Sequence, residues 1–369
     1  MNEIAPLACD VIKPIEGRFT WKGPEVDYEK QGMHIFSDAE IMEIDTALAH
    51  LKSLGEIDFP QITPKTFPLE TLEEALRGRQ GDLRSGLGFV LFRGLPIKRY
   101  PHDDLARIFY GLGSYLGVPN PQSYQGELLG HVMDVSDVEQ KARAYHAGGK
   151  MEMHTDARDI VALMCLRTPE SGGESRITSS AALHNALLET RPDLVAALYE
   201  GFLQRRMEKD AKYGNGRVLS NGKIPVFALN DGEFSCRFLG RGLRRAIEAG
   251  DVPDGGIELE AVDALEEIAL SPDYYLDMSF RQGDMQFLNN NLILHGRTEY
   301  TDKPAFYERR YLIRLWLDVP EWPELKANYV FDGAADQDIW LSRRTHLGEL
   351  PSAYLRKVED MRLHGEKID

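Results

Sequence analysis

Two side chains that can bind a metal lie close together in the segment MEMHTDARD (151–159). His154 and Asp156 are separated by one residue and precede the apolar run IVALMCL. If this region is a strand, both side chains leave it on the same face, because strand residues i and i+2 point together. An imidazole nitrogen and a carboxylate oxygen held side by side can bind one metal ion. As an isolated motif the pair has another explanation, in which Asp156 caps a turn and His154 makes a local hydrogen bond.

A third candidate ligand is His295, at the end of the apolar run in NNNLILHGRTEY (289–300). A β-barrel brings the ends of distant strands to one mouth, so the long separation from Asp156 along the chain is no obstacle. Two histidines and one carboxylate on one face of a metal leave the opposite face open, which is the arrangement of non-haem Fe(II) oxygenases. The same donors also suit Zn(II) in a hydrolase that activates water.

Arginines downstream of His295 favour the iron interpretation. If 309–317 is a strand, Arg310 and Arg314 share a face and Arg309 points away. A guanidinium inside a barrel is costly unless a carboxylate meets it, and it can meet one with two parallel hydrogen bonds. The cosubstrate 2-oxoglutarate would fit both facts, with its keto acid end on Fe(II), its far carboxylate at Arg310 and its near carboxylate close to Arg314. A structural salt bridge is the alternative for these arginines.

Strand signals gather around the candidate ligands. Apolar or alternating runs predict strands at 88–96, 159–167 and 309–317 and further strands between 274 and 300, and 224–238 has the pattern of a hairpin with its turn at Asn230 to Gly232. The fold class is therefore predicted to be mainly β with surrounding helices, an antiparallel barrel or jelly roll rather than a doubly wound parallel sheet.

Helices are expected around this β core. Ser37 and Glu40 form a capping box at the start of a helix over 37–54. Further helices are expected at 103–117, at 180–200 as two short helices that meet near Pro192, at 258–270, and at the C-terminal end over 352–369. We expect one domain over 1–369, with residues 1–80 as an N-terminal arm and helix packed on it and with helical insertions around 180–200 and 258–270.

Composition limits the classes of partner. The chain has 369 residues, of which 43% are hydrophobic, so it is long enough for a sizeable core. A net charge of −16 disfavours nucleic acid and anionic membranes and leaves a small molecule as the expected partner. Three scattered cysteines (Cys9, Cys165 and Cys236), the absence of a signal-like N-terminus and the absence of a long apolar run predict a cytoplasmic location. The oligomeric state is not predicted.

Five segments in order resemble a known family. HTD (154–156), SGGES (171–175), GD (283–284), NNNLILHGRTEY and RRYLIRLWL (309–317) are similar to the taurine dioxygenase-like (TauD/TfdA) branch of the Fe(II)/2-oxoglutarate-dependent oxygenases. The resemblance implies a double-stranded β-helix, a kind of jelly roll, and iron ligands His154, Asp156 and His295. It also implies that Arg310 binds the far carboxylate of 2-oxoglutarate, that Arg314 lies near its other end, and that Ser175 supplies a hydroxyl where relatives often have threonine.

The activity implied by the resemblance is oxidation, with hydroxylation as the expected outcome, of a C–H bond in a small polar substrate such as an amino acid or another small organic acid. The reaction consumes O2 and 2-oxoglutarate and releases succinate and CO2. Gln125 and Asp159 are candidate substrate contacts, with ordinary loop or fold-supporting roles as the alternative. The basic run RFLGRGLRR (237–245) is interpreted as a solvated face in preference to a site for an anionic substrate.

Other assignments stay open or are rejected. A zinc-dependent hydrolase with the same triad and a catalytically silent jelly-roll binding protein are the two alternative functions. His131 and His146 are not expected to bind the metal, because a fourth protein ligand would block O2 or cosubstrate. His184 is expected to be a packed or partly exposed residue of a helix.

Overall fold

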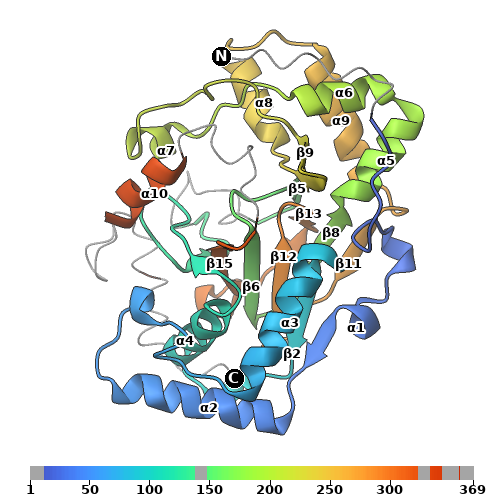
Figure 1. Cartoon of the computed structure of the whole chain (residues 1–369). Helices are drawn as coiled ribbons and strands as arrows, with labels where there is room; N and C mark the ends of the chain where they lie inside the picture. The colour runs from blue at the N-terminus through green and yellow to red at the C-terminus, as the bar shows by residue number, and fades with distance from the viewer. Residues whose placement is uncertain (1–11, 138–147, 323–332, 343–356, 358–369) are drawn as a thin grey trace.

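Two β-sheets form the centre of the computed structural model, which describes residues 12–137, 148–322, 333–342 and 357 (Figure 1). The larger sheet has the strand order β1-β2-β12-β6-β15-β3, and β4 also pairs with β15. Every pairing in it is antiparallel except that of β1 with β2. Its strands are β1 (Met33–Ile35), β2 (Phe89–Arg93), β3 (Val118–Pro119), β4 (Gly130–Val132), β6 (Ile160–Arg167), β12 (Met285–Asn289) and β15 (Tyr311–Asp318).

The smaller sheet is antiparallel and has the order β11-β8-β13-β5. These strands are β5 (Met151–His154), β8 (Ser175–Ser179), β11 (Tyr275–Met278) and β13 (Ile293–Arg297). Two strand pairs lie outside both sheets: β9 (Phe227–Asn230) with β10 (Glu233–Cys236), and β7 (Ser171–Gly172) with β14 (Tyr300–Thr301). The centre of the fold is thus β and is surrounded by helices, as predicted, but the described helices contain more residues than the strands, so the chain as a whole is not mainly β.

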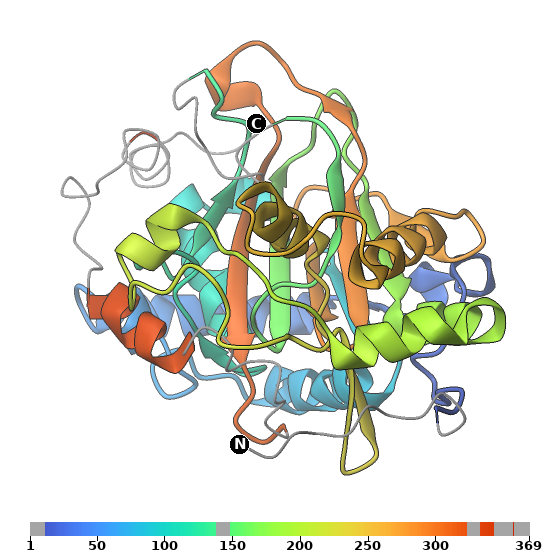
Figure 2. The same ribbon diagram turned by 90° about the horizontal axis from the view of Figure 1, so that it is seen from above.

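Helices cover both sides of this centre (Figures 1 and 2). One hydrophobic cluster joins the larger sheet to α2, α3 and α4, and a second joins the smaller sheet to α5, α6, α8 and α9. The helices are α1 (Tyr28–Gln31), α2 (Asp38–Ser53), α3 (Thr71–Ser85), α4 (His102–Gly113), α5 (Ser180–Thr190), α6 (Pro192–Glu200), α7 (Glu208–Lys212), α8 (Gly240–Glu248), α9 (Ile257–Ala269) and α10 (Gly333–Ser342).

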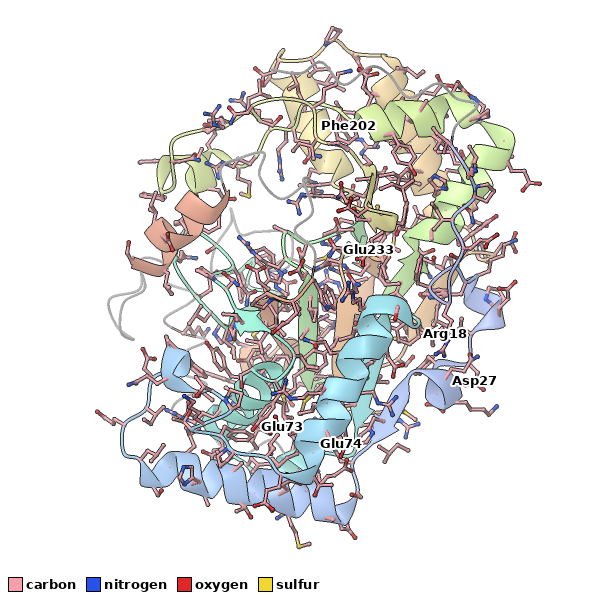
Figure 3. The ribbon with its side chains drawn as sticks, viewed as in Figure 1. Arg18, Asp27, Glu73, Glu74, Phe202 and Glu233 are labelled. Atoms are coloured by element: carbon pink, nitrogen blue, oxygen red, sulfur yellow. The ribbon has the colours of Figure 1, made fainter. Side chains whose placement is uncertain are left out.

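Local sequence signals explain several of these boundaries. Ser37 caps α2, because its side chain accepts a hydrogen bond from the Glu40 backbone N–H. The Glu40 carboxylate accepts one from the Ser37 backbone N–H, which completes the predicted capping box. The hairpin of β9 and β10 turns at Asp231 and Gly232, whose φ angles of 51° and 87° are those of a type I′ turn. Glu73 and Glu74 lie in the first turn of α3, where negative charge complements the helix dipole (Figure 3). Pro192 begins α6, as expected from its position between two helical segments.

Side chains of β15 alternate between two environments. Tyr311, Ile313, Leu315 and Leu317 belong to the cluster under the helices α2 to α4. Leu312 and Trp316 belong to other clusters on the opposite face. Arg314 shares this second face by the period of two, and Arg310 precedes the strand in phase with it. The face that is not covered by α2 to α4 therefore carries the polar groups of the site.

Two further sequence predictions concern membrane-spanning segments and the helix expected at 352–369. No helix of the described residues has both the length and the apolar character needed to cross a bilayer. The helix expected at 352–369 falls, apart from Lys357, outside the described residues.

Candidate active site

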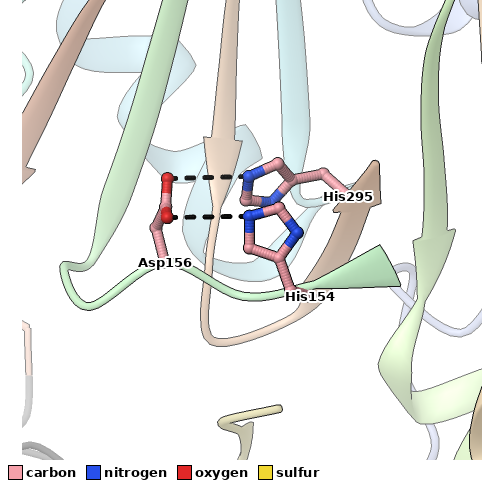
Figure 4. A group of neighbouring side chains, drawn as sticks. All are labelled: His154, Asp156 and His295. Atoms are coloured by element: carbon pink, nitrogen blue, oxygen red, sulfur yellow. Dashed lines mark ion pairs between the residues drawn. The ribbon is translucent and has the colours of Figure 1, made fainter. Parts of the chain in front are cut away.

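His154, Asp156 and His295 converge at one end of the smaller sheet (Figure 4). His154 is the last residue of β5, and its Cα partner across the antiparallel ladder is His295 of β13. The two imidazole rings are 4.4 Å apart between centroids. Asp156 follows β5 by two residues and faces both rings: its Oδ1 lies 3.7 Å from His154 Nε2 and its Oδ2 lies 3.6 Å from His295 Nε2. The predicted convergence of the three side chains is observed.

Gly296 allows the two strands to approach each other at the site. The ladder between β13 and β5 is irregular between His295 and Arg297. A Cβ atom on Gly296 would lie 2.7 Å from the carbonyl oxygen of Met151 and 2.9 Å from Met153 Sδ. Any larger side chain would therefore push β5 away from β13. The glycine next to His295 helps to set the distance between the two histidines.

The tautomer of His154 leaves its Nε2 free to bind a cation. Its Nδ1 lies 2.8 Å from the carbonyl oxygen of Glu152, which can only accept, so Nδ1 carries the proton and Nε2 keeps its lone pair. Burial and the neighbouring His295 lower the pKa of His154 to about 4, so the ring is neutral at physiological pH. A backbone carbonyl that fixes the tautomer is the usual partner of a metal-binding histidine.

Asp156 is held by groups outside the triad. Trp316 Nε1 donates a hydrogen bond of 2.8 Å to Asp156 Oδ2, and Arg314 Nη1 lies 3.6 Å from the same oxygen. Burial alone would raise the pKa of Asp156, but Arg314 and the two histidines hold it well below its ordinary value. The side chain is therefore an anion. The Asp156 backbone N–H donates to Asn290 Oδ1 at 3.2 Å.

These donors fit a divalent metal. Two donors at about 2.1 Å from one ion are about 3.0 to 3.4 Å apart in octahedral or tetrahedral geometry. The observed 3.6 and 3.7 Å, one to each carboxylate oxygen, exceed the upper end of this range by 0.2 to 0.3 Å and its lower end by 0.6 to 0.7 Å. Metal binding would require the side chains to move closer together by that amount. Two neutral nitrogens and one carboxylate, without a thiolate, suit Fe(II) or Zn(II).

Asn290 and Asp159 brace the loop that follows Asp156. Asn290 Nδ2 donates to the carbonyl oxygen of Arg158 at 2.8 Å. Both carboxylate oxygens of Asp159 accept hydrogen bonds from the scaffold, one from the Val319 N–H at 2.9 Å and one from Asn291 Nδ2 at 3.3 Å. These contacts give Asp159 a fold-supporting function, the alternative weighed against its role in substrate binding.

Arg310 is a buried cation that forms no ion pair with the described carboxylates, although the nearby charge of Asp302 stabilises it. The residue is 3% exposed and its side chain makes no ion pair within the described part of the chain. Its Nη2 donates to the carbonyl oxygen of Gly173 at 3.3 Å, and Nη1 has no hydrogen-bond partner there. Burial and the nearby Arg297 lower the pKa of Arg310 to about 10. Arg309 differs, because its guanidinium pairs with Asp137 at 2.7 and 2.9 Å.

Arg314 is oriented by a glutamine that sequence reasoning missed. Arg314 Nε donates to Gln122 Oε1 at 2.7 Å, and Gln122 Nε2 donates back to the Arg314 carbonyl oxygen at 2.6 Å. The guanidinium also lies 4.7 Å from the centre of the Trp316 ring. Gln122 lies outside the five family-like segments and Trp316 lies within RRYLIRLWL, but neither residue's type indicates its partner. Their roles follow from the pairing of distant segments.

Ser175 and Gln125, the remaining predicted contacts, are both buried. Ser175 Oγ donates to Gln286 Oε1 at 2.9 Å, and Ser175 lies two residues after Gly173, which touches Arg310. Gln125 is 5% exposed, and its Oε1 has no partner among the described residues.

The other histidines are placed as follows. His131 Nδ1 lies 2.9 Å from the hydroxyl of Tyr311, and His131 is not part of the triad. His184 is fully buried and contacts Tyr199, Phe227 and Phe234. His146 lies outside the described residues.

Arg237 departs from the solvated face that is predicted for 237–245. Its Nη1 donates to the backbone carbonyl oxygen of Asp156 at 3.3 Å. Burial, followed by the repulsion from Arg158, lowers the pKa of Arg237 to about 10. Other arginines of this run behave as expected: Arg241 is half-exposed beside Glu152, and Arg244 pairs with Asp263 and Glu266.

Comparison with known proteins decides the family. Residues 54–316 match the family model described as "Taurine catabolism dioxygenase TauD, TfdA family". The chain belongs to the TauD/TfdA family. It is therefore an Fe(II)- and 2-oxoglutarate-dependent dioxygenase, an oxidoreductase that uses O2.

Two curated relatives cover most of this family member. The taurine hydroxylase-like protein SAT17 of Stachybotrys chartarum is 30% identical over 325 residues, which are 84% of this chain and 80% of the relative. The FR-33289 synthase of Streptomyces rubellomurinus is 27% identical over 317 residues, 83% of this chain and 91% of the relative.

Solved structures share the fold of this TauD/TfdA enzyme. Asparagine oxygenase in complex with Fe(II), 3-hydroxyasparagine and succinate has a TM-score of 0.61 at 16% identity, covering 77% of this chain and 93% of that one. The oxygenase OrfP in complex with Fe and alpha-ketoglutaric acid has a TM-score of 0.55 at 16% identity, covering 78% and 94%.

Proposed function

We propose that the enzyme hydroxylates a C–H bond of a small polar substrate, an amino acid or another small organic acid, at an iron bound by His154, Asp156 and His295. The observation that carries the proposal is the set of one ligand atom from each of these residues, all within 4.8 Å of one another. Three protein ligands leave room for 2-oxoglutarate and O2. The fixed tautomer of His154 and the anionic Asp156 support the same assignment.

Arg310 is proposed to bind the far carboxylate of 2-oxoglutarate. A buried guanidinium without an ion-pair partner is costly, and a carboxylate that accepts from it removes that cost. Gly173 contributes by its size, because a Cβ atom there would lie 3.1 Å from Arg310 Nε. We assign Arg314 to the other end of the cosubstrate, and the Ser175 hydroxyl to the far end.

The protein's part in the reaction is positioning. Bound iron, together with 2-oxoglutarate and O2, supplies the oxidising power, and succinate and CO2 are released. Trp316 and Asn290 hold Asp156 from opposite ends of the residue, one at the carboxylate and one at the backbone N–H. Gln122 holds Arg314. These contacts keep the ligands and the cosubstrate in one geometry while the substrate is placed beside the metal.

We also assign the core as a double-stranded β-helix. Support comes from the strand orders β4-β15-β6-β12, which are four of the seven strands of the larger sheet, and β5-β13-β8-β11, which are all four strands of the smaller sheet. The second hydrophobic cluster contains Val161, Leu288 and Trp316 of the larger sheet and Met153, Ile177 and Leu294 of the smaller one. Side chains of both sheets therefore share one interior, as in a jelly roll.

Relatives and neighbours support the choice of a small polar substrate. OrfP was solved with hydroxylated L-arginine, and asparagine oxygenase with hydroxyasparagine. A uridine-5'-phosphate dioxygenase of Amycolatopsis is 28% identical over 180 residues, 48% of this chain and 61% of the relative. We propose a small-molecule partner rather than nucleic acid, and Gln125 as one contact because its amide oxygen is buried without a partner among the described residues. A cytoplasmic location stays a prediction.

Succinate release tests the function directly. Protein loaded with Fe(II) and 2-oxoglutarate is screened against amino acids, phosphorylated metabolites and other small acids, and we expect at least one to stimulate succinate formation. Asp156→Ala is the control, which should abolish the stimulation. A zinc hydrolase would instead show activity with Zn(II) and no consumption of 2-oxoglutarate. A silent binding protein would release no succinate with any compound.

A further inference from the structure

Two arginines that the proposed reaction does not use lie against the metal-ligand loop. Arg237 follows β10, and its Nη1 donates to the backbone carbonyl oxygen of Asp156 at 3.3 Å. Arg158 lies two residues after Asp156 in the chain. The two guanidinium groups are close enough for their charges to repel each other. Neither belongs to β15, which carries Arg314.

The scaffold fixes the position of both arginines. Phe238 and Thr155 are joined by a backbone hydrogen bond of 2.8 Å from the Thr155 N–H and by a second bond of 2.9 Å from the Phe238 N–H to Thr155 Oγ1. These bonds hold Arg237 beside the ligand loop. Asn290 holds the carbonyl oxygen of Arg158. The arginines are therefore placed by the same contacts that place Asp156.

The two arginines differ in how their charge is balanced. Arg237 makes no ion pair within the described residues. Arg158 Nη1 contacts the carboxylate of Asp318 at 3.3 Å, and the nearby charge of Asp159 also stabilises the cationic form of Arg158. Arg158 Nε is buried without a partner in the described part of the chain. Asp156 is the remaining anion near Arg237, and in the proposed function its charge is committed to iron. Two partly buried guanidinium groups at such a site favour an anion that accepts from both.

We infer that Arg158 and Arg237 bind an anionic head group of the substrate, a carboxylate, phosphonate or phosphate, and so place the rest of a small molecule beside the metal. This inference rests on the proposed function and names the class of its substrate. It assigns the substrate's anion to a pair of arginines separate from Arg310 and Arg314, which serve 2-oxoglutarate. The alternative is that both arginines only stabilise the loop.

Binding of small acids tests the inference without knowledge of the natural substrate. Kd values are measured by calorimetry for butyrate, propylphosphonate and the neutral butyramide, on anaerobic protein loaded with Fe(II) and 2-oxoglutarate. At least one acid should bind, and butyramide should bind at least about tenfold more weakly than that acid. Binding of butyrate alone or of propylphosphonate alone identifies which anion the pair accepts. Absence of binding by both acids, or equal binding of butyrate and butyramide, overturns the inference.

Matched variants assign the effect to the pair. Arg237→Gln and Arg158→Gln should each weaken acid binding by about tenfold or more, and Arg237→Lys should retain part of the affinity. Arg241→Gln is the control, because Arg241 belongs to the same run but is half-exposed beside Glu152. Acid binding that is unchanged in both glutamine variants overturns the inference.

The affinity for 2-oxoglutarate separates the two proposals. It should be unchanged in Arg237→Gln and Arg158→Gln. If these variants lose 2-oxoglutarate instead of the acids, the anion is the cosubstrate and the inference is wrong. If the wild-type protein binds no 2-oxoglutarate with Fe(II), the proposed function fails first.

Discussion

The indole Nε1 of Trp316 donates a hydrogen bond of 2.8 Å to Asp156 Oδ2. The same oxygen lies 3.6 Å from Arg314 Nη1, while Oδ1 faces His154. Trp316 therefore fixes the rotation of the carboxylate about its Cβ–Cγ bond. Oδ2 is engaged by Trp316 and also faces His295, and Oδ1 faces His154.

Replacing Trp316 by phenylalanine should weaken metal binding. Phenylalanine keeps the aromatic packing but removes the hydrogen bond to Asp156. Outer partners of metal ligands typically contribute about 10- to 100-fold in affinity, and we expect a loss in this range. Titration of the metal-free variant with Co(II), followed by its visible absorption, measures the effect.

Trp21→Phe is the matched control for this experiment. Trp21 is also buried, and its Nε1 donates to the Leu87 carbonyl oxygen at 2.9 Å, away from the triad. Its replacement should lower stability by about 1 kcal/mol and leave metal affinity unchanged. Equal metal affinities of Trp316→Phe and the wild-type protein would show that the hydrogen bond does not position Asp156.

Loss of Arg310 should weaken cosubstrate binding. Arg310→Ala removes the buried guanidinium that we assign to the far carboxylate of 2-oxoglutarate, and we expect a loss of about 2 to 5 kcal/mol in binding free energy. Calorimetric titration of the anaerobic Fe(II) protein with 2-oxoglutarate measures it. Arg309→Ala, which removes the neighbouring guanidinium bound to Asp137, should change this affinity little. A larger loss of 2-oxoglutarate affinity in Arg309→Ala than in Arg310→Ala would assign the far carboxylate to Arg309 instead.

Acid should destabilise the metal-free protein through His154. Its pKa is about 4 in the folded protein, against an ordinary value of 6.5 for a solvated histidine, so between these values the unfolded chain binds more protons. The free energy of unfolding should therefore fall as the pH drops from 6.5 to 4, by roughly 3 kcal/mol. Urea unfolding at several pH values measures the slope. His154→Asn should flatten it, and an equal slope in that variant would contradict the assignment.

Gly296→Ala should disturb the site through the backbone. The new Cβ would lie 2.7 Å from the Met151 carbonyl oxygen, so β5 must move away from His295. We expect a loss of about 1 to 3 kcal/mol in stability together with weaker metal binding. Gly78→Ala is the control: a Cβ there meets nothing within 4 Å, and alanine favours the helix α3. Normal Co(II) binding by Gly296→Ala would show that the approach of the strands does not set the site.

Local sequence information predicted the elements that depend on neighbours along the chain. The capping box of Ser37 and Glu40 and the break at Pro192 act within a few residues, and both helices begin where these residues indicated. The alternation in β15 likewise predicted that Arg310 and Arg314 would share a face, because a strand has a fixed period of two. His154, Asp156 and His295 were predicted from residue type and motif order.

Contacts between distant segments could not be predicted from one sequence. Trp316 reaches Asp156 because of the register between β15 and β6, in which Trp316 is the partner of Val161. The sequence predicts a solvated run that includes Arg237, because the hydrogen bonds that hold this residue beside the ligand loop join Thr155 and Phe238, which are 83 positions apart. Gln122 and Asn290 act across similar separations. Trp316, Asn290 and Arg237 lie in segments that the sequence singled out, but nothing near any of the four residues indicates its distant partner.

The histidines also connect the chemistry to the mechanical integrity of the smaller sheet. β5 is its edge strand, joined to the sheet through β13, and His154 is the last residue of β5. An ion shared with His295 would tether that edge to its neighbour and would add binding energy to the folded state. In the metal-free enzyme this tether is absent. We therefore expect β5 to separate from β13 more readily, which would leave the edge of β13 unpaired and open to other molecules.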